Sequence, residues 1–234
     1  MLMQQVATTT AAAKTFRYAM TIHSEGSGLT PTTSTAQGAF DHANHQGWSD
    51  SPGRDQDHPN EHRMLVIGTT LYERTSGPKQ WIKLPRRLPG ANLGLLGGNV
   101  ADPSPLLGLL RDGAQTTTRV DAATVRGVRT DRYAVTLDLD HYVTTLSPQG
   151  RRIAKQYGIA GHIPAEVWVD AQGRLRRLHF RIGVNDPSPT APGAAGGTIT
   201  EEFTLELFDF GVSVHVSPPP ADQVCAESVC SASP

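Results

Sequence analysis

The sequence has little of several features that define large classes of protein. Only two of its 234 residues are cysteines, and its aromatic residues are three Trp, five Tyr and six Phe. No apolar run approaches the roughly 20 residues that a membrane-spanning helix needs. The net charge of −1 and the pI near 6.7 give no overall attraction to nucleic acid or to an anionic membrane. We therefore expect neither a helical membrane protein nor a nucleic-acid-binding protein.

Familiar catalytic motifs are also missing. The sequence has no G-x-S-x-G elbow, no H-E-x-x-H pair, no P-loop and no dinucleotide fingerprint. A site assembled from Tyr18, His141 and Glu166 would be arbitrary, because no spacing groups them. Glu166 flanks Trp168 on the polar side of an expected strand, where a solvated carboxylate is the ordinary interpretation. We predict that the chain is not an enzyme and needs no cofactor.

A stretch rich in His and Asp, residues 41–62, raises the question of a metal site. His42 and His45 are three residues apart, and His58 and His62 are four apart, with several acids nearby. Imidazole and carboxylate groups of this kind can bind zinc. However, Pro59 interrupts the second pair, and no cysteine contributes. We expect a solvated loop and no metal ion.

Alternating hydrophobicity dominates the rest of the chain, which also has 23 Gly and 17 Pro. Residues 163–182 form its centre, because two extended runs flank the turn residues 170–173 and predict a β-hairpin. One apolar residue, Leu175, is out of phase with the rest of the second run, which indicates a bulge near Arg176 and Arg177. The hairpin has one apolar face, and that face needs a cover.

Other segments supply the remaining elements. Residues 88–100 are rich in Gly and Leu and carry no charge, so we interpret them as an apolar flap over the sheet. The helix from Asp102 to Gly113 is predicted from Asp at its N-cap and Pro in its first turn. The other expected helices are 2–13, 140–146 and 148–157. The other expected strands are 14–23, 32–41, a short one near Trp48, 80–84, 115–125, 131–139, 198–207 and 212–216. Residues 63–74 are expected to form either a strand pair or one long strand bent at Gly68.

These elements predict an α+β fold. The best strands are apolar on one face only, which favours antiparallel pairing, and a single sheet of about nine to eleven strands is expected to curl. We therefore expect a strongly curved half-barrel wrapped over a few helices. Residues 1–220 form one domain in this interpretation, and 221–234 form a flexible tail. The tail holds Cys225 and Cys230, either as a disulfide or as two free thiols.

Several motifs in this order resemble a known group. They are TFRYAMTI, IGTTLYER followed by QWIKL, DPSPLLGLL, RTDRYAVTLDL, PAEVWVDAQGRLRRL and LFDFGVSVHVSPPP, and they span residues 15–220. Together they resemble the LppX/LprG-type lipoproteins of actinobacteria, relatives of the lipoprotein carrier LolA. The resemblance implies a half-barrel that is exported to the cell envelope and holds an acyl chain or lipid between sheet and helices. Members of the group usually carry a lipidated Cys at the mature N-terminus, and this chain has none there.

The functional hypothesis is therefore extracytoplasmic binding or transport of an acyl chain, lipid or glycolipid by a monomer. A membrane anchor, if used, would lie outside this chain. The alternative for the same residues is a dry, packed core, because apolar faces exist mainly to be buried. The residues expected to line the ligand cavity are Phe16, Tyr18, Met20, Leu106, Leu107, Leu110, Val135, Leu137, Val167, Phe180, Phe203 and Leu205.

A second candidate function is a cell-envelope sensor or protein-interaction module with the same fold and no bound lipid. A basic cluster in the central hairpin is its main support, because such a cluster fits an acidic partner or a lipid headgroup. The competing interpretation is a solvated surface that keeps exposed strands from pairing with neighbouring molecules. The cluster consists of Arg174, Arg176, Arg177 and Arg181.

Overall fold

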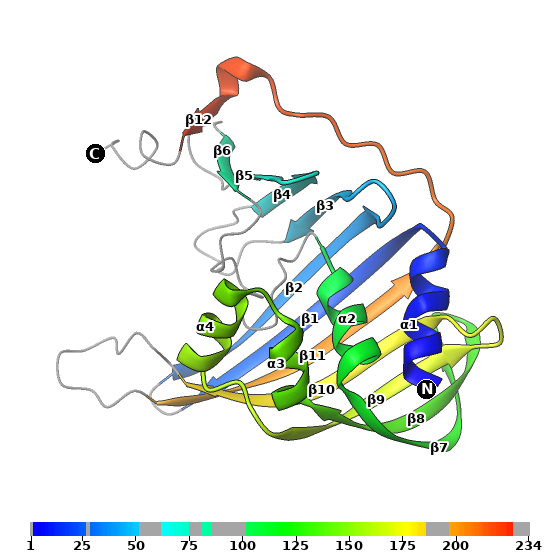
Figure 1. Cartoon of the computed structure of the whole chain (residues 1–234). Coiled ribbons are helices and arrows are strands. Elements are labelled where there is room, and N and C mark those ends of the chain that lie inside the picture. The colour runs from blue at the N-terminus through cyan, green and yellow to red at the C-terminus, as the bar shows by residue number, and fades with distance from the viewer. Residues whose placement is uncertain are drawn as a thin grey trace.

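A single, strongly curved sheet organises the molecule in the computed structural model, which describes residues 2–26, 29–51, 62–74, 81–85, 102–185 and 197–226. Its strands lie in the order β12-β6-β5-β4-β3-β2-β1-β11-β10-β9-β8-β7 (Figure 1). The strands are β1 (Thr15–Gly26), β2 (Leu29–Asp41), β3 (Gln46–Ser51), β4 (His62–Ile67), β5 (Thr70–Arg74), β6 (Trp81–Pro85), β7 (Ala114–Val125), β8 (Val128–Asp138), β9 (His162–Asp170), β10 (Leu175–Asn185), β11 (Thr198–Phe208) and β12 (Val224–Ala226).

The strands β1 to β11 pair antiparallel throughout, and β12 adds one parallel pair at the edge. The sheet stays open, because β12 and β7 lie at opposite edges. Alternation of apolar and polar residues along the strands explains the layering, because it gives the sheet one apolar face for the helices to cover. In β1, for example, Phe16, Tyr18, Met20 and Ile22 are all buried, whereas the residues between them are more exposed. The predicted α+β half-barrel is confirmed.

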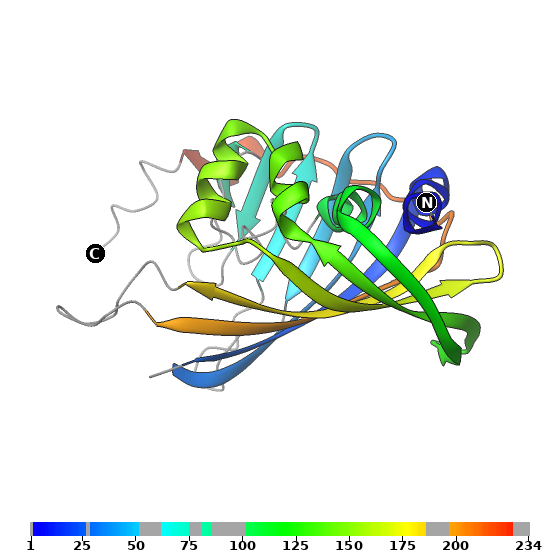
Figure 2. The ribbon, with the colours of Figure 1, turned by 60° about the horizontal axis from the view of Figure 1, so that its bottom comes forward.

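The helices of the described residues lie on one side of this sheet and cover its concave face (Figure 2). None of them is long and apolar enough to cross a membrane. Side-chain caps mark two of their starts: Asp138 accepts a hydrogen bond from the His141 N–H, and Ser147 accepts one from the Gly150 N–H. The helices are α1 (Leu2–Ala12), α2 (Ser104–Gly113), α3 (Leu139–Thr145), α4 (Pro148–Gln156) and a short 3₁₀ turn (Ala221–Gln223).

The start of α2 differs slightly from the prediction. Asp102 Oδ1 accepts a hydrogen bond from the Ser104 N–H at 3.0 Å, so the two residues form a turn before the helix. This turn leaves Pro103 at the N-cap position, and the helix begins at Ser104. The four leucines expected on the apolar face of the helix are all buried: Leu106, Leu107, Leu109 and Leu110.

The central hairpin forms as predicted. β9 and β10 pair antiparallel, and their register shifts between Leu175 and Arg177, so the bulge is confirmed. The Asp170 carboxylate holds the turn, because it accepts hydrogen bonds from the backbone N–H groups of Gln172 and Arg174. It also accepts one from the Arg176 guanidinium at 2.8 Å.

The C-terminal part of the chain departs from the prediction. Residues 212–216 are not a strand, because both sides of β11 are already occupied by β1 and β10. Instead the chain turns at Gly211 and crosses the ends of other strands, where Gln46 Nε2 donates to the Val214 carbonyl at 3.3 Å. Residues 224–226 were expected in a flexible tail, but they pair with β6 and satisfy backbone groups at its outer edge.

Some predictions fall on residues that the structure does not describe. The apolar flap at 88–100, most of the loop after Ser51, and Cys230 lie outside the described residues, as does the side chain of Cys225. The buried apolar residues that the structure does describe form one cluster between the helices and the sheet. Ring contacts within it include the stacked pair Phe180 and Phe203, with centroids 5.2 Å apart.

Candidate ligand-binding site

All twelve predicted lining residues lie inside the molecule. Each is at most 4% exposed, and all belong to one buried apolar cluster between the sheet and the helices. They come from β1, β8, β9, β10, β11 and α2, so residues up to about 190 positions apart in the sequence are brought together. The structure therefore gathers the predicted set in one place. Its use as the lining of a ligand cavity remains a prediction.

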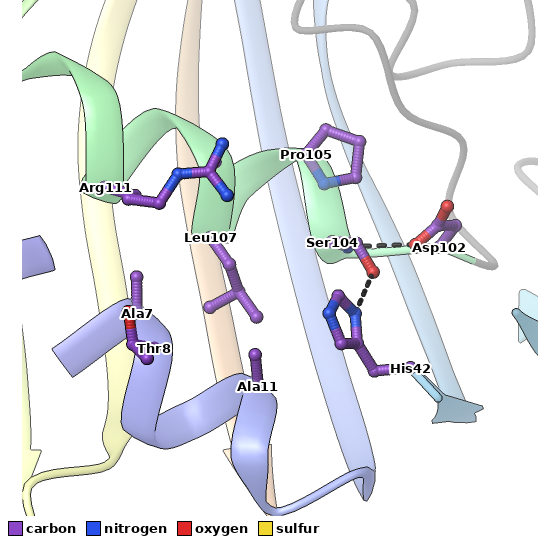
Figure 3. Close-up of a pocket in the computed structure, with 10 residues that line it drawn as sticks. Ala7, Thr8, Ala11, His42, Asp102, Ser104, Pro105, Leu107 and Arg111 are labelled. Atoms are coloured by element: carbon purple, nitrogen blue, oxygen red, sulfur yellow. Dashed lines mark hydrogen bonds between the residues drawn. The ribbon is translucent and has the colours of Figure 1, made fainter. Parts of the chain in front are cut away.

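A cleft opens beside this cluster, between α1 and α2 (Figure 3). Its volume is about 510 Å³, which lies within the range of small-molecule sites, roughly 300–1,000 Å³. Leu107 and Ala7 line the cleft and also belong to the buried cluster, so the cleft adjoins the interior. The lining residues are Ala7, Thr8, Ala11, His42, Asp102, Ser104, Pro105, Leu107, Gly108 and Arg111.

Small residues on the facing sides of the two helices keep the cleft open. Ala7 and Ala11 are four residues apart and therefore share one face of α1. Leu107, Gly108 and Arg111 share the facing side of α2 in the same way. A Cβ built on Gly108 would be 4.0 Å from its nearest neighbour, a ring carbon of Tyr142. Larger side chains at these positions would fill the space.

Polar groups gather where α2 begins. The Nδ1 atom of His42 and the hydroxyl of Ser104 are 3.0 Å apart and hydrogen bonded, and Asp102 accepts from the Ser104 backbone (Figure 3). The hydrogen bond between His42 and Ser104 connects the first turn of α2 to the end of β2. Behind them, Tyr18 donates to the Trp48 carbonyl at 3.2 Å. Burial strongly raises the pKa of Tyr18, and the nearby Asp102 charge raises it further, so the phenol stays neutral.

Arg111 contributes a paired charge to the cleft. Its guanidinium donates to both carboxylate oxygens of Asp112, at 2.8 and 2.7 Å. These hydrogen bonds lower the pKa of Asp112, although partial burial opposes the shift. The cleft is therefore lined by both apolar and polar side chains, with His42, Asp102 and Ser104 at one end and the ion-paired Arg111 at the other (Figure 3).

Sequence reasoning predicted only one residue of the cleft, Leu107. It missed the contribution of α1, because a short helix with a weak apolar pattern gives no sign of what it packs against. The pair Ala7 and Ala11, facing Gly108, is the signal that was available: small residues at helical spacing allow space between two helices. His42 was considered only as a metal ligand.

The other site hypotheses find less support in the described residues. His42 and His45 stack edge to face with ring centroids 6.2 Å apart, but no group of three or more potential ligands forms in the part of the chain that the structure describes. His58 and the side chain of His62 lie outside that part. Of the residues considered for catalysis, Tyr18 is buried inside, whereas Glu166 binds Arg132 at 2.7 Å on the outer face of the sheet.

Each arginine of the predicted basic cluster forms an ion pair within the molecule. Arg174 and Arg176 both pair with Asp170, Arg177 pairs with Glu206, and Arg181 pairs with Glu25 at 2.6 Å. Arg177 also lies over the Trp168 ring, 5.2 Å from its centroid. These contacts favour a structural and solvating role for the four arginines over a partner-binding role.

Comparison with known proteins tests the fold. No protein-family model and no curated protein sequence matches the chain. Among solved structures, LprF from Mycobacterium bovis is similar, with a TM-score of 0.53 at 15% identity over 93% of this chain and 95% of LprF. The Mycobacterium tuberculosis lipoprotein LppX is similar with a TM-score of 0.52 at 15% identity, over 92% of this chain and 96% of LppX.

The chain has the LppX-type fold. The similarity runs over nearly the full length of both proteins. It confirms the architecture that the sequence motifs predicted. At 15% identity the similarity shows the fold alone. A fold does not identify a ligand, so the ligand must be inferred from the residues of this chain.

Proposed function

We propose that this protein binds an acyl chain, lipid or glycolipid between its sheet and helices and carries it outside the cytoplasm. The cleft between α1 and α2 is the observation that supports this proposal most directly, because it shares Ala7 and Leu107 with the buried apolar cluster. An apolar tail entering there would reach the buried apolar cluster beside Ala7 and Leu107. The polar group of such a ligand would remain near His42 and Ser104.

The likeness to LprF and LppX supports the proposed location. LppX is a lipoprotein by name, and both proteins share the fold over more than nine-tenths of this chain. We propose by the same reasoning that the protein works in the cell envelope as a monomer without enzymatic activity.

Mass spectrometry of the freshly purified native protein tests the proposal. We expect a co-purified lipid mass that disappears after extraction with organic solvent. The extracted protein should then gain thermal stability when a long-chain fatty acid or phospholipid is added, since a ligand at about 100 times its Kd stabilises by roughly 2.7 kcal/mol. Absence of both the bound mass and the thermal shift would contradict the proposal.

Two substitutions distinguish an interior that contains a ligand cavity from one that is fully packed. Leu107→Trp places a larger side chain next to the cleft, so we expect the protein to keep its stability and lose the thermal shift with lipid. Leu137 is a predicted lining residue that is fully buried and does not border the cleft, so Leu137→Trp tests whether the cavity continues into the interior. A hollow should accept this side chain and lose the thermal shift with lipid, whereas a packed core should lose roughly 1–3 kcal/mol, measured by urea unfolding. Destabilisation of that size by both changes would favour the packed core.

The same experiments address the alternative function. An envelope sensor or interaction module with this fold would be purified without lipid and would retain a defined protein partner in a pull-down. The paired state of Arg174, Arg176, Arg177 and Arg181 makes this alternative the weaker one.

A further inference from the structure

The helix α4 carries a cluster of cations that no carboxylate of the described residues neutralises. Its sequence, PQGRRIAKQ, includes Arg151, Arg152 and Lys155 within five residues. No Asp or Glu occurs anywhere in residues 141–165. Although the chain has a net charge of −1, this segment is locally basic.

Most arginines elsewhere in the described residues are arranged differently. Ten arginines form ion pairs with Asp or Glu, mostly across the outer face of the sheet: Arg17, Arg63, Arg111, Arg119, Arg126, Arg132, Arg174, Arg176, Arg177 and Arg181. On α4, Arg152 and Lys155 are exposed and make no ion pair with any described residue. The cations of α4 are therefore available to an external anion.

Arg151 has a different local role but keeps its charge. Its guanidinium donates to the carbonyls of Leu146 and Thr144, at 2.5 and 3.5 Å, and so closes the C-terminal end of α3. Its partners are carbonyls, and no carboxylate of the described residues forms an ion pair with it.

The three cations share one side of the helix. At 3.6 residues per turn, Arg151, Lys155 and Arg152 fall within an arc of about 100°. The opposite side holds Ala154, the one buried residue of α4, together with the half-buried Ile153. The helix thus has a basic outer side and a narrow apolar side that attaches it to the molecule.

The position of α4 leaves its basic side accessible. In both views of the ribbon α4 is the outermost helix of the layer, at the end opposite α1, with only α3 as a helical neighbour (Figures 1 and 2). A flat anionic surface can approach this end of the molecule without meeting another helix.

We propose that α4 docks the protein on an anionic lipid surface, through electrostatic contact of Arg152, Lys155 and Arg151 with phosphate headgroups. Basic residues on an exposed amphipathic helix are attracted to anionic bilayers. Three cations give a weak, reversible contact, which suits a carrier that must leave the surface again. This inference goes beyond the proposed ligand binding, because it concerns where the protein docks and does not depend on a lipid inside it.

Vesicle binding tests the proposal. The full chain should co-sediment with vesicles of phosphatidylcholine and phosphatidylglycerol and not with vesicles of phosphatidylcholine alone. Binding should weaken as salt rises from about 0.05 to about 0.5 M, because the shorter screening length reduces attraction between exposed charges. The Arg152→Gln/Lys155→Gln double variant should bind about 30-fold more weakly, since each cation near the surface contributes about five-fold.

A matched control removes the same charge elsewhere. Lys83 on β6 and Arg129 on β8 are also exposed and form no ion pair with the described residues. The Lys83→Gln/Arg129→Gln variant should therefore bind as the unmodified protein does. Equal binding to both kinds of vesicle, equal loss in the two double variants, or no loss in the α4 variant would each overturn the proposal. If α4 instead binds an acidic protein, the chain will not bind anionic vesicles better than neutral ones, and the proposal fails.

Discussion

A single carboxylate, that of Asp170, holds the turn of the central hairpin. Its side chain is completely buried, and it accepts hydrogen bonds from two backbone N–H groups and from the guanidinium groups of Arg174 and Arg176. Burial acts to raise the pKa of Asp170, but the hydrogen bonds from Arg174 and Arg176 outweigh it and lower the pKa below its usual range.

We expect Asp170→Asn to destabilise the protein by about 3 kcal/mol, because the change leaves the nearly buried Arg176 without its counter-ion. The measurement is urea unfolding at neutral pH. Since the folded pKa is lowered, the stabilisation from ionised Asp170 is complete above about pH 4 and is lost as pH falls through the folded value. As the pH falls below about 4, the free energy of unfolding should therefore decrease less for the variant than for the wild type.

An exposed carboxylate provides the control. Asp121 pairs with Arg132 at 2.8 Å on the surface, and such pairs contribute little. Asp121→Asn should leave the unfolding curve unchanged. A similar loss in both variants would show that the buried position of Asp170 is not the cause.

Glycine is required at one position of β2. A Cβ on Gly38 would lie 2.0 Å from the Trp48 carbonyl oxygen and 2.5 Å from the Tyr18 hydroxyl. We expect Gly38→Ala to cost roughly 1–3 kcal/mol or more through overpacking, measured by the thermal midpoint. Gly108→Ala is the counterpart in a helix with open space around it, and it should stabilise by about 0.5–1 kcal/mol. Equal effects would contradict the steric explanation.

At the scale of elements, β12 has a larger role than its three residues suggest. It pairs with β6 in parallel, Val224 opposite Trp81, and so closes the edge of the sheet farthest from β7. We expect a chain that ends at residue 220 to show faster amide exchange in β6 and unchanged exchange in β1 and β11. A chain that ends at residue 226 keeps β12 and should exchange as the full chain does. Unchanged exchange in β6 of the shorter chain would show that β12 contributes nothing there.

Most elements could be predicted from the sequence, because each carries its own signal. Alternation of apolar residues located β1, β8 and β11, and turn residues located the central hairpin with its bulge. Signals of this kind are local. They failed for residues 212–216, where alternation was present but no strand edge was available to pair with. They failed again for β12, whose pairing depends on the exposed edge of β6 and not on its own three residues.

At the scale of the whole molecule, the sequence predicted which residues become interior but not where the interior opens. All twelve residues chosen for the lining are buried together, because the face of a strand follows directly from alternation. The cleft depends on how closely α1 and α2 approach, and that distance is set by pairs of small residues on two helices about 100 positions apart. Only Leu107 belongs to both sets.

The pairing of β1 with β11 has a consequence for the order in which the chain is synthesised. Met20 on β1 lies opposite Leu205 on β11. The strand β1 is synthesised first and β11 nearly last, so one edge of β1 stays unpaired until almost the whole chain has been made. Until then the nascent chain consists of two separate meanders with unsatisfied edges, and joining segments so far apart is intrinsically slow and prone to aggregation. We therefore expect the joining of β1 to β11 to be a late step in the folding of this protein.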